Sequence, residues 1–290
     1  MTESFGTDLE LFSVSGDDIQ AVLAHDKEAV LNALYQGLPL GVYTAMRTFE
    51  HVKFLHLEEH LSRLDRSMAM LSWDYHLDRI ALRLALHQVC NEYNHPDARV
   101  RIDILAKGES QFITGSRVLI SLQPFTPIAE QIYQNGVQVS IVPALTRDQP
   151  EIKKAEFAVL RRKYLESDPT KYECLIANED GFLLEGTTSN YYGVRDGVIW
   201  TAGSGVLEGV ARMIVLKLAD VNRIEVRYEP LTTNDIPTLS EAALSSSSRG
   251  LIPIVQIGEQ IVGDGTPGPI TKQLIGKYRD YVLREMKPAL

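Results

Sequence analysis

Short apolar segments joined by tight turns recur along this chain and limit the folds that it can adopt. Residues 41–49 alternate between apolar and polar side chains, as in a β-strand, and residues 51–57 repeat the pattern. Turn residues at 179–181 (Glu-Asp-Gly) and at 196–197 (Asp-Gly) separate two further pairs of strand-like segments. Turns of this kind join neighbouring antiparallel strands, so the sequence predicts β-hairpins in both halves of the chain.

Segments with helical periodicity lie between the strands. The clearest is residues 57–73, in which Leu57, Leu61, Leu64 and Met68 share one face. Further helices are expected at 27–36, 77–93, 152–167, 206–221 and 268–286, and further strands at 98–106, 116–125, 137–145 and 242–248. Because these strands and helices do not strictly alternate along the chain, the sequence predicts an α+β fold.

The 290 residues suffice for one large or two medium domains. Residues 124–136 carry two prolines and end in Asn135-Gly136, which favours a domain boundary there. We expect a smaller N-terminal α+β domain over residues 1–125 and a larger C-terminal domain over 126–290. Each is expected to be a largely antiparallel sheet or barrel with packed helices.

Composition excludes several classes of function. The 29 basic and 38 acidic residues give a net charge of −9, so no nucleic-acid partner is expected. No apolar run approaches the roughly 20 residues of a membrane span, and the acidic N-terminus lacks a signal-peptide pattern. The two cysteines are far apart, which favours reduced thiols in a cytoplasmic protein. Cysteine and histidine do not cluster, so no metal is expected.

The segment EGTTSN, residues 185–190, places an acid at the end of an apolar strand and follows it with small residues. One interpretation is a hairpin turn whose acid faces water. The other is a carboxylate beside the cationic ring nitrogen of a cofactor, because an opposite charge within hydrogen-bond reach favours the ionised form of both groups. A charged pyridinium is what makes pyridoxal phosphate an electron sink.

Three other features suit the same cofactor. Lys153 and Lys154 are adjacent, and a lysine can bond covalently to the cofactor aldehyde. Gly209 precedes a helix whose first N–H groups can bind a phosphate. The run Ser245–Ser248 offers hydroxyls without bulk. Taken singly, these features are also consistent with a solvated lysine pair, an ordinary helix start and a polar loop.

Together these residues resemble the class IV, or fold type IV, pyridoxal-phosphate enzymes. This family includes branched-chain aminotransferases, D-amino-acid aminotransferases and 4-amino-4-deoxychorismate lyases. The segments GVYTAMRTFE and EHLSRL of the N-terminal half are similar to the same family, and the resemblance covers about residues 38–285. It implies a two-domain α+β enzyme that binds pyridoxal 5′-phosphate at the domain junction and forms a homodimer.

The resemblance also implies a role for individual residues. Lys153 matches the lysine that bonds to the cofactor, with Lys154 as the alternative, and Glu185 matches the acid at the ring nitrogen. The other implied cofactor contacts are Arg63, Val210, Ala211, Ser246 and Ser247 around the phosphate, Leu207 under the ring and Asn190 near its edge. An ordinary solvated helix arginine is the alternative for Arg63. Tyr43 matches an aromatic residue on the substrate side.

Some positions depart from the family pattern. Ala211 replaces a threonine, Phe157 a tyrosine and Thr44 an acid, while Ala45 occupies the position of the catalytic threonine of the lyases. The first 35 residues do not match the family's opening strand.

The function expected from the resemblance is amino transfer from an amino acid, branched-chain-like or D-configured, or from an amine to a 2-oxo acid. The alternatives are an aminodeoxychorismate lyase and a non-catalytic cofactor-binding protein. A positive side chain should hold the substrate carboxylate. Arg101 shares a strand face with Arg99 and Asp103, and Arg249 ends the serine loop; of the two we expect Arg249 to bind the carboxylate.

Overall fold

The computed structural model of the chain describes residues 8–22, 40–108, 115–143, 147, 149–168 and 170–290. Two compact units separate between Thr126 and Pro127. The N-terminal unit also takes in Ile152–Ala158 and Glu285–Leu290, whereas residues 127–151 and 159–284 belong to the C-terminal unit. This border lies one residue from the boundary that we expect between residues 125 and 126. The domain limits themselves stay a prediction.

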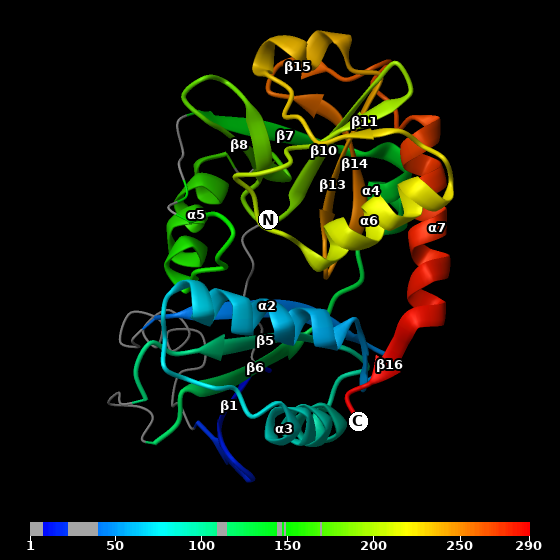
Figure 1. Cartoon of the computed structure of the whole chain (residues 1–290). Coiled ribbons are helices and arrows are strands. Elements are labelled where there is room, and N and C mark those ends of the chain that lie inside the picture. The colour runs from blue at the N-terminus through cyan, green and yellow to red at the C-terminus, as the bar shows by residue number, and fades with distance from the viewer. Residues whose placement is uncertain (1–7, 23–39, 109–114, 144–146, 148, 169) are drawn as a thin grey trace. The chain divides into compact units, whose positions relative to one another are not determined.

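The N-terminal unit has a seven-stranded sheet in the order β16-β4-β3-β5-β6-β1-β2. Figure 1 labels β1, β5, β6 and β16 of this sheet. Its strands are β1 (Glu10–Ser15), β2 (Asp18–Ala21), β3 (Val42–Phe49), β4 (Lys53–Leu55), β5 (Ala98–Ile104), β6 (Val118–Pro124) and β16 (Met286–Pro288). All neighbours pair antiparallel. The hairpin expected from 41–49 and 51–57 is confirmed as β3 and β4, whereas β1, β2 and β16 were not expected.

Two amphipathic helices share a core with this sheet. In α2 (Leu57–Met70), Leu61 and Leu64 are buried, and in α3 (Arg79–Glu92), Leu82 and Leu86 are buried in the same cluster. Asp78 is the N-cap of α3, and its carboxylate accepts the N–H of Ala81 at 3.0 Å. Both helices match their expected positions, and the helix expected at 27–36 lies outside the described residues.

The C-terminal unit contains a closed barrel of six strands. They are β7 (Val137–Pro143), β8 (Glu173–Ala177), β9 (Leu183–Gly186), β10 (Asn190–Arg195), β13 (Glu241–Ser246) and β14 (Gly250–Ile257). Strand β9 pairs with both β8 and β10, which closes the ring. The pairs β7–β8 and β7–β14 are parallel. Three short strands extend the sheet: β11 (Val198–Trp200), β12 (Val226–Arg227) and β15 (Gln260–Ile261).

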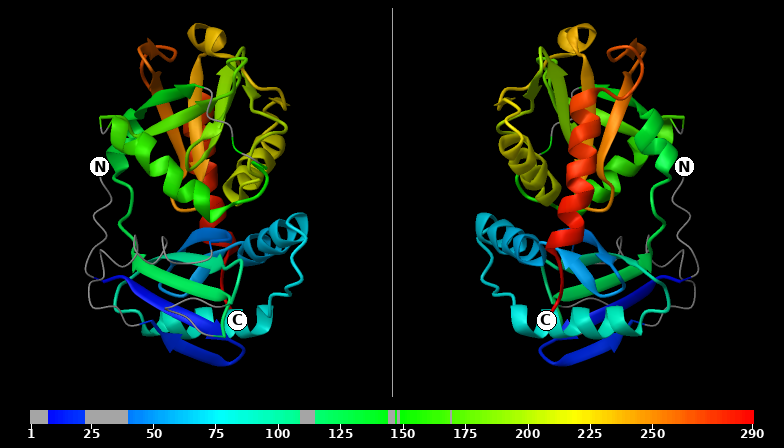
Figure 2. Two further views of the ribbon diagram at one scale, coloured as in Figure 1. Left: turned by 90° about the vertical axis from the view of Figure 1, so that its left-hand side faces the viewer. Right: turned by 90° about the vertical axis from the view of Figure 1, so that its right-hand side faces the viewer.

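Helices lie outside the barrel strands, as Figure 2 shows for α6 (Val210–Val221) and α7 (Pro269–Glu285). The 3₁₀-helix η1 (Thr233–Thr238) and the short α4 (Glu130–Asn135) were not expected. Helix α5 (Ala155–Ser167) begins three residues later than expected. The reason is that residues 153–155 pair with residues 41–43, so Lys153 and Lys154 precede the helix.

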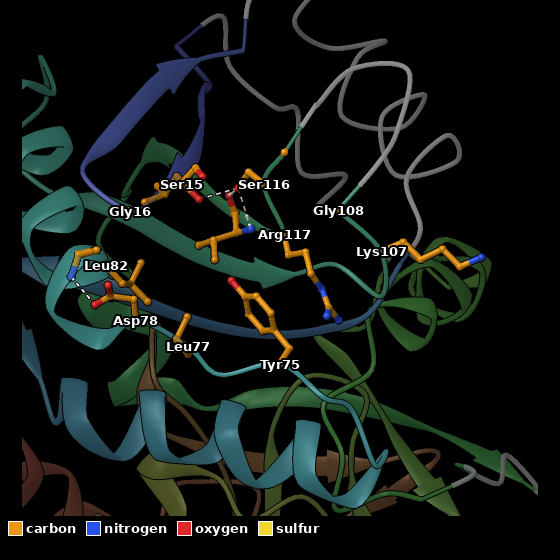
Figure 3. Close-up of a pocket in the computed structure, with 14 residues that line it drawn as sticks. Ser15, Gly16, Tyr75, Leu77, Asp78, Leu82, Lys107, Gly108, Ser116 and Arg117 are labelled. Atoms are coloured by element: carbon orange, nitrogen blue, oxygen red, sulfur yellow. Dashed lines mark hydrogen bonds between the residues drawn. The ribbon is translucent and has the colours of Figure 1, made fainter.

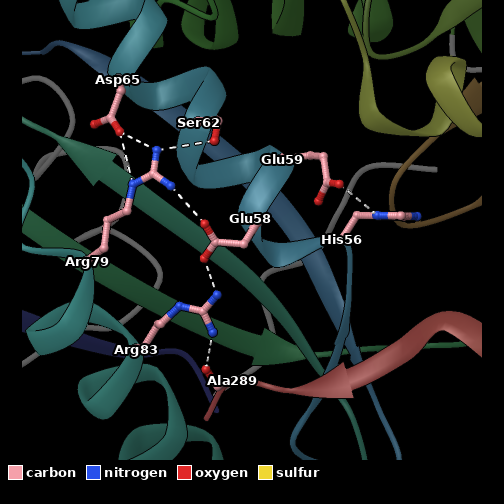
Figure 4. A network of polar contacts seen from close by, with 8 residues as sticks. All are labelled: His56, Glu58, Glu59, Ser62, Asp65, Arg79, Arg83 and Ala289. Carbon is pink, nitrogen blue, oxygen red and sulfur yellow. Dashed lines mark hydrogen bonds and ion pairs between the residues drawn. The ribbon is translucent and has the colours of Figure 1, made fainter.

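Residues 286–290 belong to the N-terminal unit and are held there by strand pairing and hydrogen bonds. Strand β16 pairs with β4, and Arg83 donates to the carbonyl of Ala289 at 2.5 Å. The same guanidinium pairs with Glu58, which also binds Arg79 at 2.8 Å (Figure 4). The network therefore joins α2, α3 and the C-terminal segment of the chain.

Arg83→Met should loosen this C-terminal segment. The variant loses the hydrogen bonds to Ala289 and Glu58. Because these bonds are partly exposed, we expect the free energy of unfolding to fall by only about 1 kcal/mol. Hydrogen exchange at residues 286–288 should accelerate. Arg66→Met, at an exposed position of α2, is the control and should change neither quantity. Unchanged exchange in Arg83→Met would contradict the assigned anchoring.

Candidate functional site

In the N-terminal unit, Lys153, Tyr43 and Arg101 lie together. The Lys153 carbonyl accepts the Tyr43 N–H at 3.0 Å, and Lys153 Nζ lies 5.0 Å from the centre of the Tyr43 ring. The Arg101 guanidinium lies over the same ring at 3.9 Å. Tyr43 itself is buried. Three residues that the sequence analysis selected separately are thus neighbours around one aromatic ring.

The strand-like pairing of residues 153–155 distinguishes the two lysines. Successive side chains of an extended segment point to opposite sides. Lys154 forms the bridge with Val42, and it is Lys153 whose amine lies near the Tyr43 ring. Only one of the two lysines can therefore face this aromatic group.

Arg101 pairs with a carboxylate of its own strand. Its Nε and Nη2 donate to the two oxygens of Asp103 at 2.8 and 2.6 Å. Asp103 is buried, and its register partner on β3 is Tyr43. The expectation that Arg101 and Asp103 share one strand face is confirmed, and the face is a largely buried polar one.

Arg63 is buried at 4% exposure, so the alternative of a solvated helix arginine does not hold. Its Nη2 donates to Thr44 Oγ1 at 2.8 Å, and the same hydroxyl lies 2.7 Å from His60 Nδ1. Burial lowers the pKa of Arg63 to about 10, with a smaller opposing contribution from Tyr43. Burial, together with the charges of Arg63 and Lys153, lowers the pKa of His60 well below its ordinary value, so the imidazole is neutral at pH 7.

In the C-terminal unit, Glu185, Asn190 and Leu207 form a connected group. Glu185 is 3% exposed and is the register partner of Asn190 where the barrel closes. One of its oxygens accepts the Leu207 N–H at 3.1 Å, and the other is paired with Arg147. Asn190 Nδ2 donates to the Leu207 carbonyl at 2.8 Å. The segment does form a turn between strands, but its acid does not face water.

Glycine is required immediately after Glu185. A side-chain carbon on Gly186 would overlap Ser189 Oγ and the Glu173 carboxylate. The Gly186 N–H donates to the Ser189 carbonyl at 2.8 Å, which closes the turn Thr187–Ser189. The small residues of EGTTSN therefore reflect close packing against Glu173 as well as the space expected for a ligand.

Helix α6 begins directly beside this group. Gly209 is its N-cap, and a side-chain carbon there would overlap Asn190 Oδ1. Within the described residues, no backbone carbonyl accepts the N–H groups of Val210 and Ala211. These two donors, together with the helix dipole, suit an anion.

The serine run ends strand β13. Ser245 is buried and bonds the Tyr192 hydroxyl at 2.8 Å, whereas Ser246 and Ser247 are half-buried. Ser246 Oγ accepts Arg249 Nε at 2.9 Å. Arg249 is also paired with the buried Glu173, with 2.9 Å between Nη2 and the carboxylate.

Sequence reasoning missed Arg147, His60 and Glu173. Arg147 lies in a polar stretch of the sequence that has no distinguishing pattern. His60 falls on the buried face of α2, where it reads as part of an amphipathic helix. Glu173 did carry a signal, because it is the one charged residue of the otherwise apolar strand β8.

The described part of the chain also contains a cavity away from these groups. It has a volume of about 570 Å³, lies in the N-terminal unit, and is lined by residues that include Tyr75, Lys107 and Arg117 (Figure 3). None of the site residues expected from the sequence lines it.

Comparison with known proteins identifies the family. The model of amino-transferase class IV matches residues 41–257. This chain belongs to the class IV aminotransferases. The D-alanine aminotransferase of Bacillus licheniformis is 26% identical over 255 residues, which are 84% of this chain and 88% of that protein.

Solved structures share the fold. The branched-chain amino acid aminotransferase of Thermobaculum terrenum in its PLP form has a TM-score of 0.78 at 21% identity, over 97% of this chain and 98% of that one. The branched-chain aminotransferase of Thermoproteus uzoniensis with norvaline has a TM-score of 0.74 at 19% identity, over 97% of this chain and 99% of that one. The expected two-domain α+β, fold type IV architecture is confirmed.

Class IV aminotransferases are transaminases that use pyridoxal phosphate, so the expected activity and cofactor are confirmed and the lyase is not favoured. The described residues fit this cofactor. Thr187 Oγ1, two residues after Glu185, is buried and has no hydrogen-bond partner among the described residues, and the free N–H groups of Val210 and Ala211 suit a phosphate. In the part of the chain that the structure describes, no helix is long and apolar enough to cross a membrane, and no cluster of acidic, histidine and cysteine side chains could hold a metal.

The close approach at Gly209 yields a test. Gly209→Ala should displace the Asn190 amide, and we expect a loss of roughly 1–3 kcal/mol in unfolding free energy because the added methyl group overfills the contact. Gly276→Ala, in α7 where nothing lies within 4 Å of the added carbon, should instead stabilise the helix by roughly 0.5–1 kcal/mol. Denaturant titration of both variants measures these opposite changes in unfolding free energy. An unchanged unfolding free energy in Gly209→Ala would contradict the tight contact.

Proposed function

We propose that Lys153 is the lysine that bonds to pyridoxal phosphate and that Glu185 is the acid beside the ring nitrogen. The observation that carries the proposal is the environment of Glu185. Its carboxylate is buried, is held by Arg147 and the Leu207 N–H, and lies near the start of α6. A buried carboxylate fixed in this way can face a cationic ring.

When bound, pyridoxal phosphate supplies an electron sink for the electrons of the bond broken at the substrate α-carbon. Once the substrate amine has displaced Lys153 from the cofactor, the freed Lys153 Nζ would act as general base and general acid, taking the proton from the substrate α-carbon and returning it to the cofactor carbon to which the lysine had been bonded. Glu185 would supply the negative charge beside the ring nitrogen. Release of the first product before the second substrate binds gives ping-pong kinetics.

We assign the remaining residues to cofactor binding. The Arg63 guanidinium, the N–H groups of Val210 and Ala211, and the hydroxyls of Ser246 and Ser247 would hold the phosphate. Leu207 would support the ring from below, and Asn190 fixes Leu207 through its bond to the Leu207 carbonyl. Charge-assisted bonds to a phosphate are stronger than neutral ones, so Arg63 should contribute most.

The substrates that we propose are an amino acid, D-configured or branched-chain-like, or an amine as donor and a 2-oxo acid as acceptor. Tyr43 and Arg101 would lie on the substrate side, because both lie near Lys153. Arg249 is the other arginine proposed for the substrate carboxylate. Each of these arginines already has a carboxylate partner in its own unit, so a substrate carboxylate would share the guanidinium.

We further propose that the enzyme is cytoplasmic and acts as a homodimer. Both cysteines, Cys90 and Cys174, are free and buried, which suits a reducing compartment. The homodimer rests on the family alone, and sedimentation equilibrium measures it.

The assignment of Lys153 is tested by chemical trapping. Borohydride reduction of the cofactor-loaded protein, followed by peptide mapping, should place the pyridoxyl group on Lys153. Lys154→Met is the matched control, and it should still be labelled on Lys153. A label on Lys154, or an unlabelled protein, would refute the assignment.

Glu185→Gln should keep most of the bound cofactor and lose most of the turnover. An amide has nearly the same shape but supplies no negative charge at the ring nitrogen, so we expect kcat to fall by about two orders of magnitude or more. Steady-state rates with D-alanine and with leucine as donors measure the change. Turnover at the wild-type rate would show that Glu185 has another task.

A further inference from the structure

Glu173 is a buried charge that the proposed chemistry does not use. It is the first residue of β8, is 1% exposed, and its four neighbours along the strand are apolar and buried. A carboxylate in such a position is costly unless it is both paired and hydrogen-bonded. Its location therefore calls for a specific set of partners.

Those partners lie in the turn that follows Glu185. One Glu173 oxygen accepts the Thr188 N–H at 2.5 Å and the Ser189 hydroxyl at 3.0 Å. The same oxygen packs against Gly186, where it leaves no room for a side chain. Glu173 thus determines the path of the backbone from Glu185 to Asn190.

The second oxygen of Glu173 faces Arg249, 2.9 Å from Nη2. Arg249 links the same turn to the serine loop, because Nη2 donates to Thr188 Oγ1 at 2.5 Å and Nε to Ser246 Oγ at 2.9 Å. Burial lowers the pKa of Arg249, and the Glu173 carboxylate and Tyr172 outweigh this effect and raise it. The guanidinium stays charged and joins two segments distant in sequence.

We infer that Glu173 is a positioning residue for cofactor binding. It fixes the Thr187–Ser189 turn directly and, through Arg249, the loop that carries Ser246. The segment with Glu185 and the segment with Ser246 then keep a constant separation, which a rigid ligand held at both would need. The inference rests on the proposed function, and Glu173 itself touches neither cofactor nor substrate.

A set of variants separates the two tasks of the carboxylate. Glu173→Gln retains an acceptor for Thr188 and Ser189 and loses the charge, whereas Glu173→Ala loses both. Arg249→Met leaves Glu173 buried without its cation, and the double variant Glu173→Gln/Arg249→Met removes both charges. Glu241→Gln is the matched control. Glu241 is also buried in this unit, but its carboxylate binds the N–H groups of Ile270 and Thr271 at the start of α7.

The measurements are the dissociation constant of pyridoxal phosphate, from absorbance titration, and amide exchange at residues 187–189 in the cofactor-free protein. We expect Glu173→Gln to raise the dissociation constant about tenfold and Glu173→Ala to raise it further. Exchange at the turn should accelerate in both. The double variant should bind the cofactor more tightly than Arg249→Met alone, because it has no uncompensated buried charge. Glu241→Gln should lower the melting temperature and leave the dissociation constant unchanged.

Half-reactions with an amino acid and with the corresponding amine complete the test. A similar loss of half-reaction rate with both donors in Arg249→Met would agree with a positioning role for the Glu173–Arg249 pair. Selective loss of the amino acid, with an unchanged dissociation constant for pyridoxal phosphate in Arg249→Met, would leave Arg249 with the proposed contact to the substrate carboxylate alone and overturn the positioning role given to the pair.

The outcomes also separate this inference from the proposed function. If the wild type binds the cofactor and Glu173→Gln binds it equally well with unchanged exchange, only the role of Glu173 is overturned. If the wild type does not bind pyridoxal phosphate, the proposed function fails and the role of Glu173 fails with it.

Discussion

The closure of the C-terminal barrel at Glu185 and Asn190 is the constraint on which the candidate site depends. Strand β9 is short, and it joins the ring to β10 through the register pair formed by these two residues. Because side chains alternate along a strand, a slip by one residue would turn Glu185 to the opposite face. The same residue pair therefore closes the barrel and orients the Glu185 carboxylate. Hydrogen bonds of Glu185 and Asn190 to Leu207 then position the segment before α6 relative to this pair.

Partly buried arginines, each paired with a buried carboxylate, recur around the candidate site residues. Arg147 pairs with Glu185, Arg249 with Glu173, and Arg101 with Asp103. Such pairs add little net stability, because the desolvation of two charges offsets most of their attraction, but breaking one leaves a costly unpaired charge. They restrict each side chain to one arrangement. In this chain they are found beside the segments that are proposed to bind ligand, where a fixed geometry matters most.

Much of the fold followed from local patterns. The hairpins β3–β4, β8–β9 and β10–β11 are each encoded by a few turn residues between apolar strands, and α2, α3 and α6 by periodicity and end signals such as Gly209. What local patterns do not encode is long-range pairing. Strand β16 adopts its structure by adding to β4 from the far end of the sequence. Residues 153–155 form an extended pairing where periodicity favoured a helix, because residues 41–43 supply their hydrogen-bond partners.

The candidate site shows the same division. Glu185, Gly209 and Lys153 stand out because each breaks a local pattern, as an acid at a strand end, a glycine at a helix start and a lysine before a helix. Arg147 and His60 do not, because their roles come from partners distant in sequence. Arg63 illustrates the consequence. Its burial beside the Thr44 hydroxyl and the neutral His60 cannot be recognised from EHLSRL alone. Thr44, which stands where the family usually has an acid, supplies one of these partners from 19 residues away in the sequence, so no pattern local to α2 could have shown it.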